Sequence, residues 1–367
     1  MFPEVTAIST PVGFKQLGAL QIGEKIQAPF GAGIIGEAEI TAVVKKPFQG
    51  KVVKLLLKNG SELIATPDQP IFVEIATLRR WHTYVMFREQ MGYRLGVTET
   101  NSGTRKSGTS HHRLSGEAAD KMWLLAGLDT RSEAQFLEQK YSIIYGLPTW
   151  VFKARVDTGR NKSAYTQQLV NQLFEDIDTP KSFSKMAAEF GLMESYPHFM
   201  AHATTAGTGR SKINLQFFGD TRAQKTNPVS QRLHKININT GNENIVKSLR
   251  AMDFSVRSGR ASTFRYETSQ KNYHNIFKEA CQIRAVTGSI IDQRSKLFPD
   301  GCLQKLLNIG GILPGWNIIL KEGNALQRIE VVDKMWVDLE GEVVNLGVKN
   351  VECFFTNNIA VSSTLDS

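Results

Sequence analysis

The sequence predicts a mainly β domain assembled from both chain ends and interrupted by an α/β insertion of two subdomains. Both ends read as short apolar strands separated by turn residues, whereas the middle of the 367-residue chain mixes helical and extended patterns. The charge is divided in the same way. Residues 79–296 hold 32 Lys+Arg against 19 Asp+Glu, a net charge of +13, while the whole chain carries +9.

The N-terminal end predicts a β-hairpin followed by a further strand. Apolar β-formers at 51–57 and 62–66 flank Asn59-Gly60, the dipeptide that most strongly favours a tight hairpin turn. A second turn at 66–70 contains two prolines and precedes a strand at 71–75.

The C-terminal end has the same pattern, with a turn at Gly323-Asn324. Strands are predicted at 318–320, 328–332, 342–348 and 352–361. The two ends, taken as 7–78 and 297–363, total 139 residues, a size typical of one compact domain.

The middle divides into subdomains at 79–160 and 161–296. The first runs strand, strand, helix, strand, helix, with a Ser/Thr/Gly/Arg-rich segment at 100–115 that we predict to be a mobile loop. Its strands are predicted at 83–88, 93–98 and 122–126, with a helix at 131–145 capped by Ser132. The second has predicted helices at 165–176, 182–190, 242–252 and 272–285, and strands at 213–218, 234–239, 254–256 and 264–268.

Composition excludes several function classes. No run of 18 apolar residues predicts a membrane span, and no signal peptide pattern precedes the first strand. The three cysteines have neither disulfide-framework nor metal-ligand spacing, so we expect a cytoplasmic protein, monomeric and without a membrane partner. The basic middle favours double-stranded DNA as a partner, with a solvated basic surface as the alternative.

Four stretches of the two ends resemble the motifs of inteins, whose splicing domain has the Hint fold. They are residues 7–26, 60–70, 344–361 and 361–364. The resemblance implies a self-splicing domain at 7–78 and 297–363. It also implies flanking extein remnants at 1–6 and 364–367, a host extein protein in cis, and no cofactor for splicing.

Splicing begins with a thiol or hydroxyl that attacks the preceding carbonyl, and ends with cyclisation of a terminal Asn. In the resemblance, Ala7 replaces the Cys or Ser nucleophile and Ser363 replaces that Asn, so the splicing nucleophiles are absent. At the other motif positions, Thr66 is kept, while Gln69, Ser362 and Glu352 each stand where the motifs have a histidine. Thr364 remains as the acceptor nucleophile of the downstream flank. Two explanations remain open: the changes were introduced, or the domain has decayed or varied naturally.

Residues 81–155 resemble a diverged GIY-YIG homing endonuclease module. The resemblance implies phosphodiester hydrolysis, in which a tyrosine positions water, an arginine stabilises the anionic transition state, and a carboxylate holds Mg²⁺. The matching residues are Tyr84, Tyr93, Arg105 or Arg113, and Glu138 for the metal. A DNA-binding remnant and a purely structural insertion, in which the tyrosines only pack, are the alternatives. Residues 125–129 also resemble the start of a LAGLIDADG helix, but read better as a strand and turn.

The second subdomain carries a basic run that suits phosphate contacts. Its residues are Arg250, Arg257, Arg260, Arg265 and Lys271, with Tyr266 and Tyr273 between them as candidates for base stacking. The rival function is a non-splicing DNA-binding protein in which the Hint-like β-domain is only a scaffold.

Overall fold

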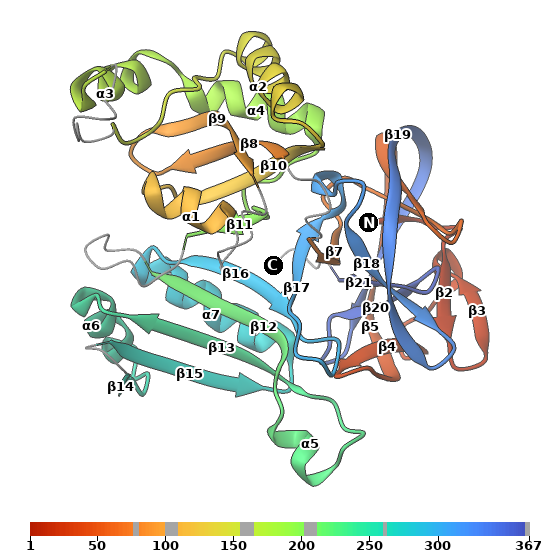
Figure 1. Ribbon diagram of the computed structural model, residues 1–367. Helices are drawn as coiled ribbons and strands as arrows, with labels where there is room; N and C mark the ends of the chain where they lie inside the picture. Colours follow the sequence, from red (N-terminus) through yellow and green to blue (C-terminus); the bar gives the residue numbers. More distant parts are fainter. Residues whose placement is uncertain (76–80, 100–108, 155–164, 202–210, 260–262, 364–367) are drawn as a thin grey trace. The chain divides into compact units, whose positions relative to one another are not determined.

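The computed structural model describes residues 1–75, 81–99, 109–154, 165–201, 211–259 and 263–363 (Figure 1). The chain forms two compact units. One combines Met1–Ala76 with Ala203–Ser367, and the other is Thr77–His202. Each unit has its own sheet and its own core.

Both chain ends contribute to the β part of the first unit, which confirms the mainly β domain. Its longest ladder pairs β5 (Ile34–Leu57) with β19 (Ala325–Val348) in antiparallel fashion. We predicted separate short strands in the second of these regions. The structure joins them into one continuous strand, in which residues 333–341 lie on partly or fully exposed positions.

The predicted hairpins are confirmed. The Asn59-Gly60 turn joins β5 to β6 (Glu62–Ala65), and Gly323-Asn324 joins β18 (Asn317–Glu322) to β19. The turn that contains Pro67 and Pro70 leads into β7 (Pro70–Glu74), as predicted. The remaining elements of this part are β2 (Ala7–Thr10), β3 (Gly13–Gln16), β4 (Lys25–Gly31), β17 (Gln304–Asn308), β20 (Cys353–Thr356), β21 (Ile359–Ser362), and the 3-10 turns η1 (Leu17–Ala19) and η2 (Ile309–Gly311).

The first residues of the chain are an integral part of this domain. β1 (Phe2–Pro3) pairs with β19, with Phe2 opposite Val344. The Phe2 side chain is fully buried, and its ring lies 6.0 Å from that of Phe354. Residues 2 and 3, which the resemblance assigns to a flanking extein remnant, are therefore packed into this domain.

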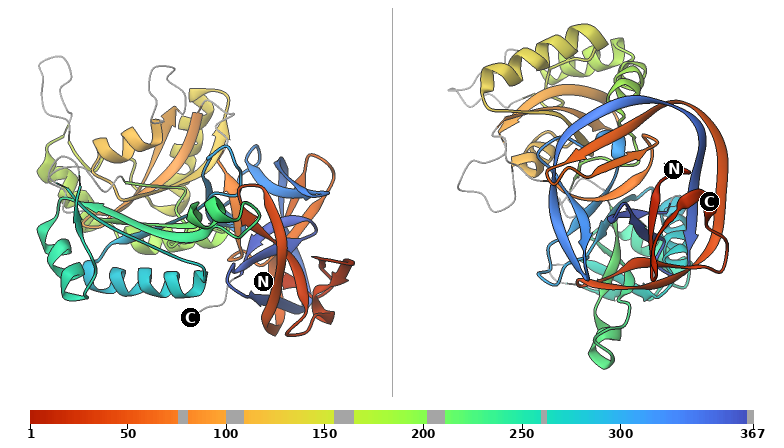
Figure 2. Two further views of the ribbon diagram at one scale, coloured as in Figure 1. Left: turned by 90° about the horizontal axis from the view of Figure 1, so that it is seen from below. Right: turned by 90° about the vertical axis from the view of Figure 1, so that its right-hand side faces the viewer.

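Residues 211–296 form a second sheet within the same unit. The order is β16-β12-β13-β15, with β12 and β16 parallel and the other pairs antiparallel. The helix α7 covers one face of it (Figure 2, left). The elements are β12 (Lys212–Asp220), α5 (Arg222–Thr226), β13 (Leu233–Thr240), α6 (Glu243–Ala251), β14 (Arg257–Ser258), β15 (Phe264–Gln270), α7 (Tyr273–Thr287) and β16 (Ile290–Ser295).

This second sheet is continuous with the β-domain. Strand β16 pairs with β17, which pairs with β7, and the rings of Phe72 and Phe217 meet edge to face at 5.3 Å. The strand predicted at 254–256 is wrong. The short strand of this region is β14, which begins only after the turn that follows α6.

The second unit has the predicted order of strand, strand, helix, strand, helix. Its sheet order is β9-β8-β10-β11, and residues 125–128 end β10, which confirms a strand rather than a LAGLIDADG helix. The elements are β8 (Trp81–Arg88), β9 (Gly92–Glu99), α1 (Thr109–Gly116), β10 (Lys121–Leu128), α2 (Arg131–Tyr145), α3 (Gln167–Asp176), α4 (Thr179–Phe190) and β11 (Phe199–Met200).

Three local predictions for this unit need correction. The N-cap of α2 is Thr130, not Ser132, because Thr130 forms a reciprocal capping box with Glu133. Helix α1 occupies the end of the segment that we predicted to be a loop, and 100–108 lie outside the described residues. The unit also extends to His202, beyond the predicted boundary at 160, because Phe183 of α4 packs in its core.

Candidate functional site

One turn of the β-domain holds the start of the chain. The main-chain nitrogen of Met1 donates to Thr66 Oγ1 at 2.6 Å, and the Thr66 nitrogen donates to the Met1 carbonyl at 2.9 Å. The turn is closed by a hydrogen bond from the Gln69 nitrogen to the Thr66 carbonyl. Thr66 therefore forms hydrogen bonds with both the nitrogen and the carbonyl oxygen of residue 1.

The same turn reaches the other end of the domain through Gln69. This side chain is fully buried, and its Nε2 donates to the Ser362 carbonyl at 2.7 Å and to the Pro70 carbonyl at 2.9 Å. Because both partners are carbonyl oxygens, they fix which end of the amide faces them. The amide donor of Gln69 therefore points at the peptide bond between Ser362 and Ser363.

A tight turn before β20 holds the other side of that peptide bond. Glu352 adopts a left-handed φ of 46°. Its carbonyl accepts from the Ser363 nitrogen at 2.9 Å and from Ser362 Oγ at 3.2 Å. The bond between Ser362 and Ser363 is thus fixed at its oxygen by Gln69 and at its nitrogen by Glu352.

The Glu352 carboxyl is the unusual ionisable group of this site. Burial raises its pKa to about 7, although a backbone N–H from Val348 and the nearby Ser363 side chain act in the opposite direction. Its Oε2 is buried without a partner in the described part of the chain. A carboxyl with a pKa near neutrality can exchange a proton at physiological pH.

The structure places Ala7 away from this turn. Ala7 lies on β2 opposite Gln16, and its carbonyl accepts from the Asn357 nitrogen at 2.8 Å. Met1, which lies outside the four motif stretches, is the residue that Thr66 contacts. The available signal was Phe2, an apolar residue of the kind that buries in a strand. Thr364 lies outside the described residues.

In the second unit, Tyr84 and Arg113 are brought together. Arg113 Nε donates to the Tyr84 hydroxyl at 3.0 Å, and Arg94 approaches the same oxygen at 3.4 Å. Arg94 also binds both carboxylate oxygens of Glu117 at 2.7 Å, and Arg113 binds Glu117 at 3.0 Å. A Cβ on Gly96 would overlap the Tyr84 hydroxyl, so this position requires glycine.

Tyr93 does not join this cluster. Register pairs Tyr84 with Gly96 and Tyr93 with Phe87, which puts the two tyrosines on opposite faces of the sheet. Tyr93 instead stacks on Phe183 at 4.0 Å. Tyr93 therefore does not meet Tyr84 and Arg113 at one site, contrary to the expectation, because its register position faces the opposite side of the sheet. Arg105 lies outside the described residues.

Glu138 lies in α2, half-buried, and interacts with the cluster electrostatically. Burial raises the pKa of its carboxyl, and the positive charges of Arg94 and Arg113 offset only part of that rise. No three His, Cys, Asp or Glu side chains converge on a metal-sized site within the described ranges. Mg²⁺ is commonly held by one carboxylate together with water and substrate phosphate, so Glu138 fits that ion only in such an arrangement.

The predicted DNA-contacting residues of the first unit lie around one hairpin. Arg257 and Arg265 face each other across β14 and β15, and Arg250, at the end of α6, lies over the ring of Phe264. Lys271 is exposed, and Arg260 lies outside the described residues. The expected stacking role of Tyr266 and Tyr273 is wrong. Both are buried, and Tyr273 stacks on Phe217 at 3.6 Å.

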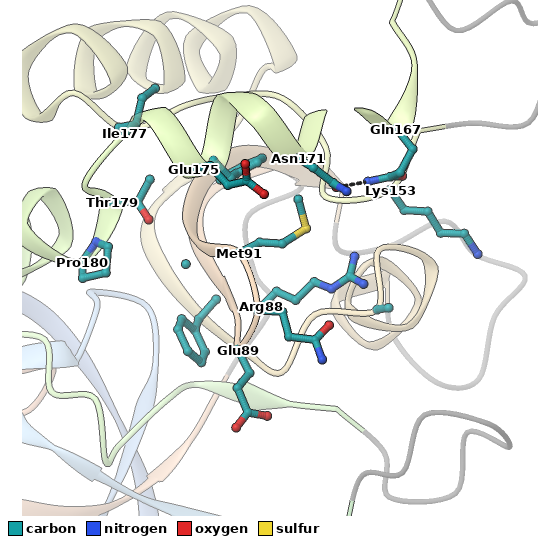
Figure 3. Close-up of a pocket in the computed structure, with 15 residues that line it drawn as sticks. Arg88, Glu89, Met91, Lys153, Gln167, Asn171, Glu175, Ile177, Thr179 and Pro180 are labelled. Carbon is teal, nitrogen blue, oxygen red and sulfur yellow. Dashed lines mark hydrogen bonds between the residues drawn. The ribbon is translucent and has the colours of Figure 1, made fainter. Parts of the chain in front are cut away.

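The second unit also contains a cavity of about 630 Å³ between its sheet and α3 (Figure 3). Arg88 and Lys153 line it together with Glu89 and Glu175. These charges balance in number and favour neither an anion nor a cation. The cavity therefore identifies no ligand.

Comparisons with known proteins are sparse. No family model and no curated protein matches the chain. Among solved structures, it is similar to the Msm DnaB1 intein splicing domain bound with zinc, at 17% identity and a TM-score of 0.18, covering 20% of this chain and 56% of that one. It is also similar to the MchDnaB-1 intein, at 14% identity and a TM-score of 0.16, covering 29% of this chain and 64% of that one. The gp41-1 intein is similar at 18% identity and a TM-score of 0.17, covering 28% of this chain and 87% of that one.

The chain thus spans little more than half the length of the first of these structures. TM-scores in this range are too low to establish a shared fold. No helix of the described residues is long and apolar enough to cross a membrane.

Proposed function

We propose that the β-domain is a protein-splicing domain of the Hint type, and that its two splice junctions adjoin residue 1 and residue 363. One observation carries this proposal: a single turn contacts Met1 through Thr66 and the Ser362 carbonyl through Gln69. Splicing joins the two flanks of a domain, so it requires that both junctions lie beside shared polar groups. A domain that served only as a scaffold has no need to bring its ends to one turn.

The proposal revises the position of the first nucleophile. The motif residue Thr66 is expected beside the bond that is attacked, and it binds Met1 rather than Ala7. The position for a Cys or Ser is therefore residue 1. Methionine offers no thiol or hydroxyl for attack on a preceding carbonyl, so the first step remains blocked in this sequence.

Cysteine substitution at either position tests this assignment. The chain carries a reporter flank before residue 1 in all variants, and a thiol is added to cleave any thioester. Met1→Cys is expected to release the flank, because the new thiol adjoins the bond beside Thr66. Ala7→Cys is the matched control and should release nothing, since the carbonyl that it would attack, that of Thr6, accepts from the Leu17 nitrogen and is not bound by the turn at Thr66. Release from Ala7→Cys alone would restore the original assignment, and release from neither would favour the scaffold function.

A second candidate function belongs to the second unit, and the Arg113–Tyr84 hydrogen bond favours it. We infer that this unit is a nucleic-acid-binding, GIY-YIG-like module acting on the phosphodiester bonds of double-stranded DNA. Arg113 is partly exposed, at 33% of its side chain, and can reach a phosphate. Glu138 would hold Mg²⁺ with phosphate and water oxygens, and the ion would supply charge stabilisation. Arg250, Arg257, Arg265 and Lys271 would contact the DNA backbone through the other unit.

DNA binding and cleavage are tested separately because they can fail separately. Binding to duplex DNA should weaken steeply as the salt concentration rises. The double variant Arg257→Ala with Arg265→Ala should lower the slope of log affinity against log salt concentration by the contribution of about two phosphate contacts. Cleavage in the presence of Mg²⁺ should be abolished by Arg113→Ala and by Glu138→Gln. Salt-dependent binding without cleavage by the unchanged chain would identify a DNA-binding remnant, and neither activity would identify a structural insertion.

A further inference from the structure

We propose that Ser363 is a nucleophile towards its own preceding peptide bond, so that the chain can cleave itself between Ser362 and Ser363 without the terminal Asn of the splicing motif. The proposal concerns the same site as the proposed function. It uses only residues present in this chain and needs neither a residue-1 nucleophile nor flanking reporters.

The first support is the way the bond is held. Gln69 Nε2 lies 2.7 Å from the Ser362 oxygen, in a fully buried position. If the carbonyl carbon became tetrahedral, negative charge would develop on that oxygen. A fixed donor in a water-excluded place stabilises such charge more than a donor in water does. The Ser363 nitrogen, held by the Glu352 carbonyl at 2.9 Å, is the leaving group.

The second support is the pair of unused polar groups beside the bond. Ser363 Oγ and Glu352 Oε2 are both buried and form no hydrogen bond of normal geometry with the described residues, yet the two side chains lie close enough for Ser363 to lower the pKa of Glu352. Buried polar atoms without partners are uncommon and cost free energy. A nucleophile and a base that lie beside each other, and that align fully only during reaction, account for both of them. The neighbouring Ser362 hydroxyl, by contrast, is already bonded to the Glu352 carbonyl.

The protonation state of Glu352 agrees with this geometry. Burial raises the pKa of this carboxyl to about 7, so both the carboxylate and the acid are populated near neutral pH. Such a group can first accept a proton and then return it. Gln69 cannot do so, because an amide neither gains nor loses a proton in this range.

The reaction balances without a cofactor. The Ser363 hydroxyl oxygen attacks the Ser362 carbonyl carbon, and its proton passes to the Glu352 carboxylate. As the carbon–nitrogen bond breaks, that proton is delivered to the Ser363 nitrogen. The product is an ester between the Ser362 carbonyl and Ser363 Oγ, with a free amine at Ser363. Water then hydrolyses the ester, leaving Ser362 with a carboxylate and releasing residues 363–367.

Hydroxylamine trapping of the unmodified full-length chain tests the proposal. Hydroxylamine converts the ester to a hydroxamate on Ser362 and prevents its reversal. Intact mass spectrometry should then show a species that has lost residues 363–367 and ends in that hydroxamate. Asn59-Gly60 is the chain's one Asn-Gly bond and is itself sensitive to hydroxylamine, but its products have different masses.

Variants give the test its controls. Ser363→Ala should abolish the product, and Ser363→Cys should accelerate it because a thiol is the better nucleophile. Glu352→Gln and Gln69→Leu should each slow it on the order of 100-fold. Ser61→Ala, in the turn after β5, should leave it unchanged. The proposal is overturned if neither the unchanged chain nor Ser363→Cys yields the hydroxamate, or if Ser363→Ala yields as much. These outcomes are independent of flank release from Met1→Cys.

Discussion

The side-chain amide of Gln69 donates a 2.7 Å hydrogen bond to the carbonyl of Ser362, a residue 293 positions away in the chain. Its neighbour in the same turn, Thr66, binds the backbone of Met1. Two residues three positions apart therefore connect both ends of the β-domain. Several consequences for stability and chemistry can be measured.

Gln69→Leu should destabilise the first unit by about 1–3 kcal/mol, because it removes the Gln69 hydrogen bonds to the buried Ser362 carbonyl and to the Pro70 carbonyl. Gln16→Leu, on an exposed position of β3, is the matched control and should change the free energy of unfolding little. Denaturant-induced unfolding of both variants measures the difference. Equal effects would mean that the Gln69 bonds contribute nothing specific.

Glu352 should make the first unit less stable as the pH rises from about 4.5 to about 7. The folded state holds its proton up to the higher pKa, whereas the unfolded state loses it near the lower one, so unfolding becomes easier across this window. The change amounts to about 3 kcal/mol. The ionisable group that interacts with it is the adjacent Cys353 thiol, and Lys349 on the same turn is paired with Glu39.

Comparison of the unchanged chain with Glu352→Gln isolates this contribution. The difference in the free energy of unfolding between pH 5 and pH 8 should shrink in the variant, since glutamine does not titrate. An identical pH dependence in both proteins would show that the carboxyl is not buried as described.

Gly96→Ala should destabilise the second unit by about 1–3 kcal/mol and displace Tyr84 from Arg113, because the added Cβ overlaps the Tyr84 ring. Gly116→Ala, at the end of α1, meets nothing within 4 Å and serves as the control. Hydrogen exchange of the β8 and β9 amides measures local stability. Unchanged protection in Gly96→Ala would contradict the described packing.

Glu117→Gln should cost about 3–5 kcal/mol in the second unit, because Arg94 is only 1% exposed and would lose its carboxylate partner. Replacing both partners by apolar residues, Arg94→Met with Glu117→Leu, should cost much less. Hydrogen exchange at the β8–β10 strands again provides the measurement. A double variant as damaged as the single one would show that the cost arises from the other partners of Glu117, such as Arg113, and not from an unpaired Arg94.

The sequence predicted the local structure well where turn residues mark it. The Asn59-Gly60 and Gly323-Asn324 hairpins and the α2 helix lie where expected, because their signals are short-range. The site was predicted only in part. The turn at 66–69 was identified, but its partner is Met1 rather than Ala7, since pairing between chain ends depends on long-range strand register.

Dependence on long-range strand register also limited the prediction for the second unit. Tyr84 and Arg113 meet as expected, yet Tyr93 lies on the other face of the sheet. Arg94 and Glu117 were not selected at all, because a buried ion pair has no local sequence signal. The boundary at 160 was misplaced for a related reason: Phe183 reaches its core partners from a helix that follows a long connection.

The central claim is that residues 1 and 363 adjoin two splice junctions served by one turn. The most direct measurement is the intact mass of a flanked chain in which the motif residues are restored together. The substitutions are Met1→Cys, Gln69→His, Glu352→His, Ser362→His and Ser363→Asn. The account predicts two products, the ligated flanks and a free fragment of residues 1–363. A folded chain that stays whole, with neither junction cleaved, would contradict it and leave the β-domain as a scaffold.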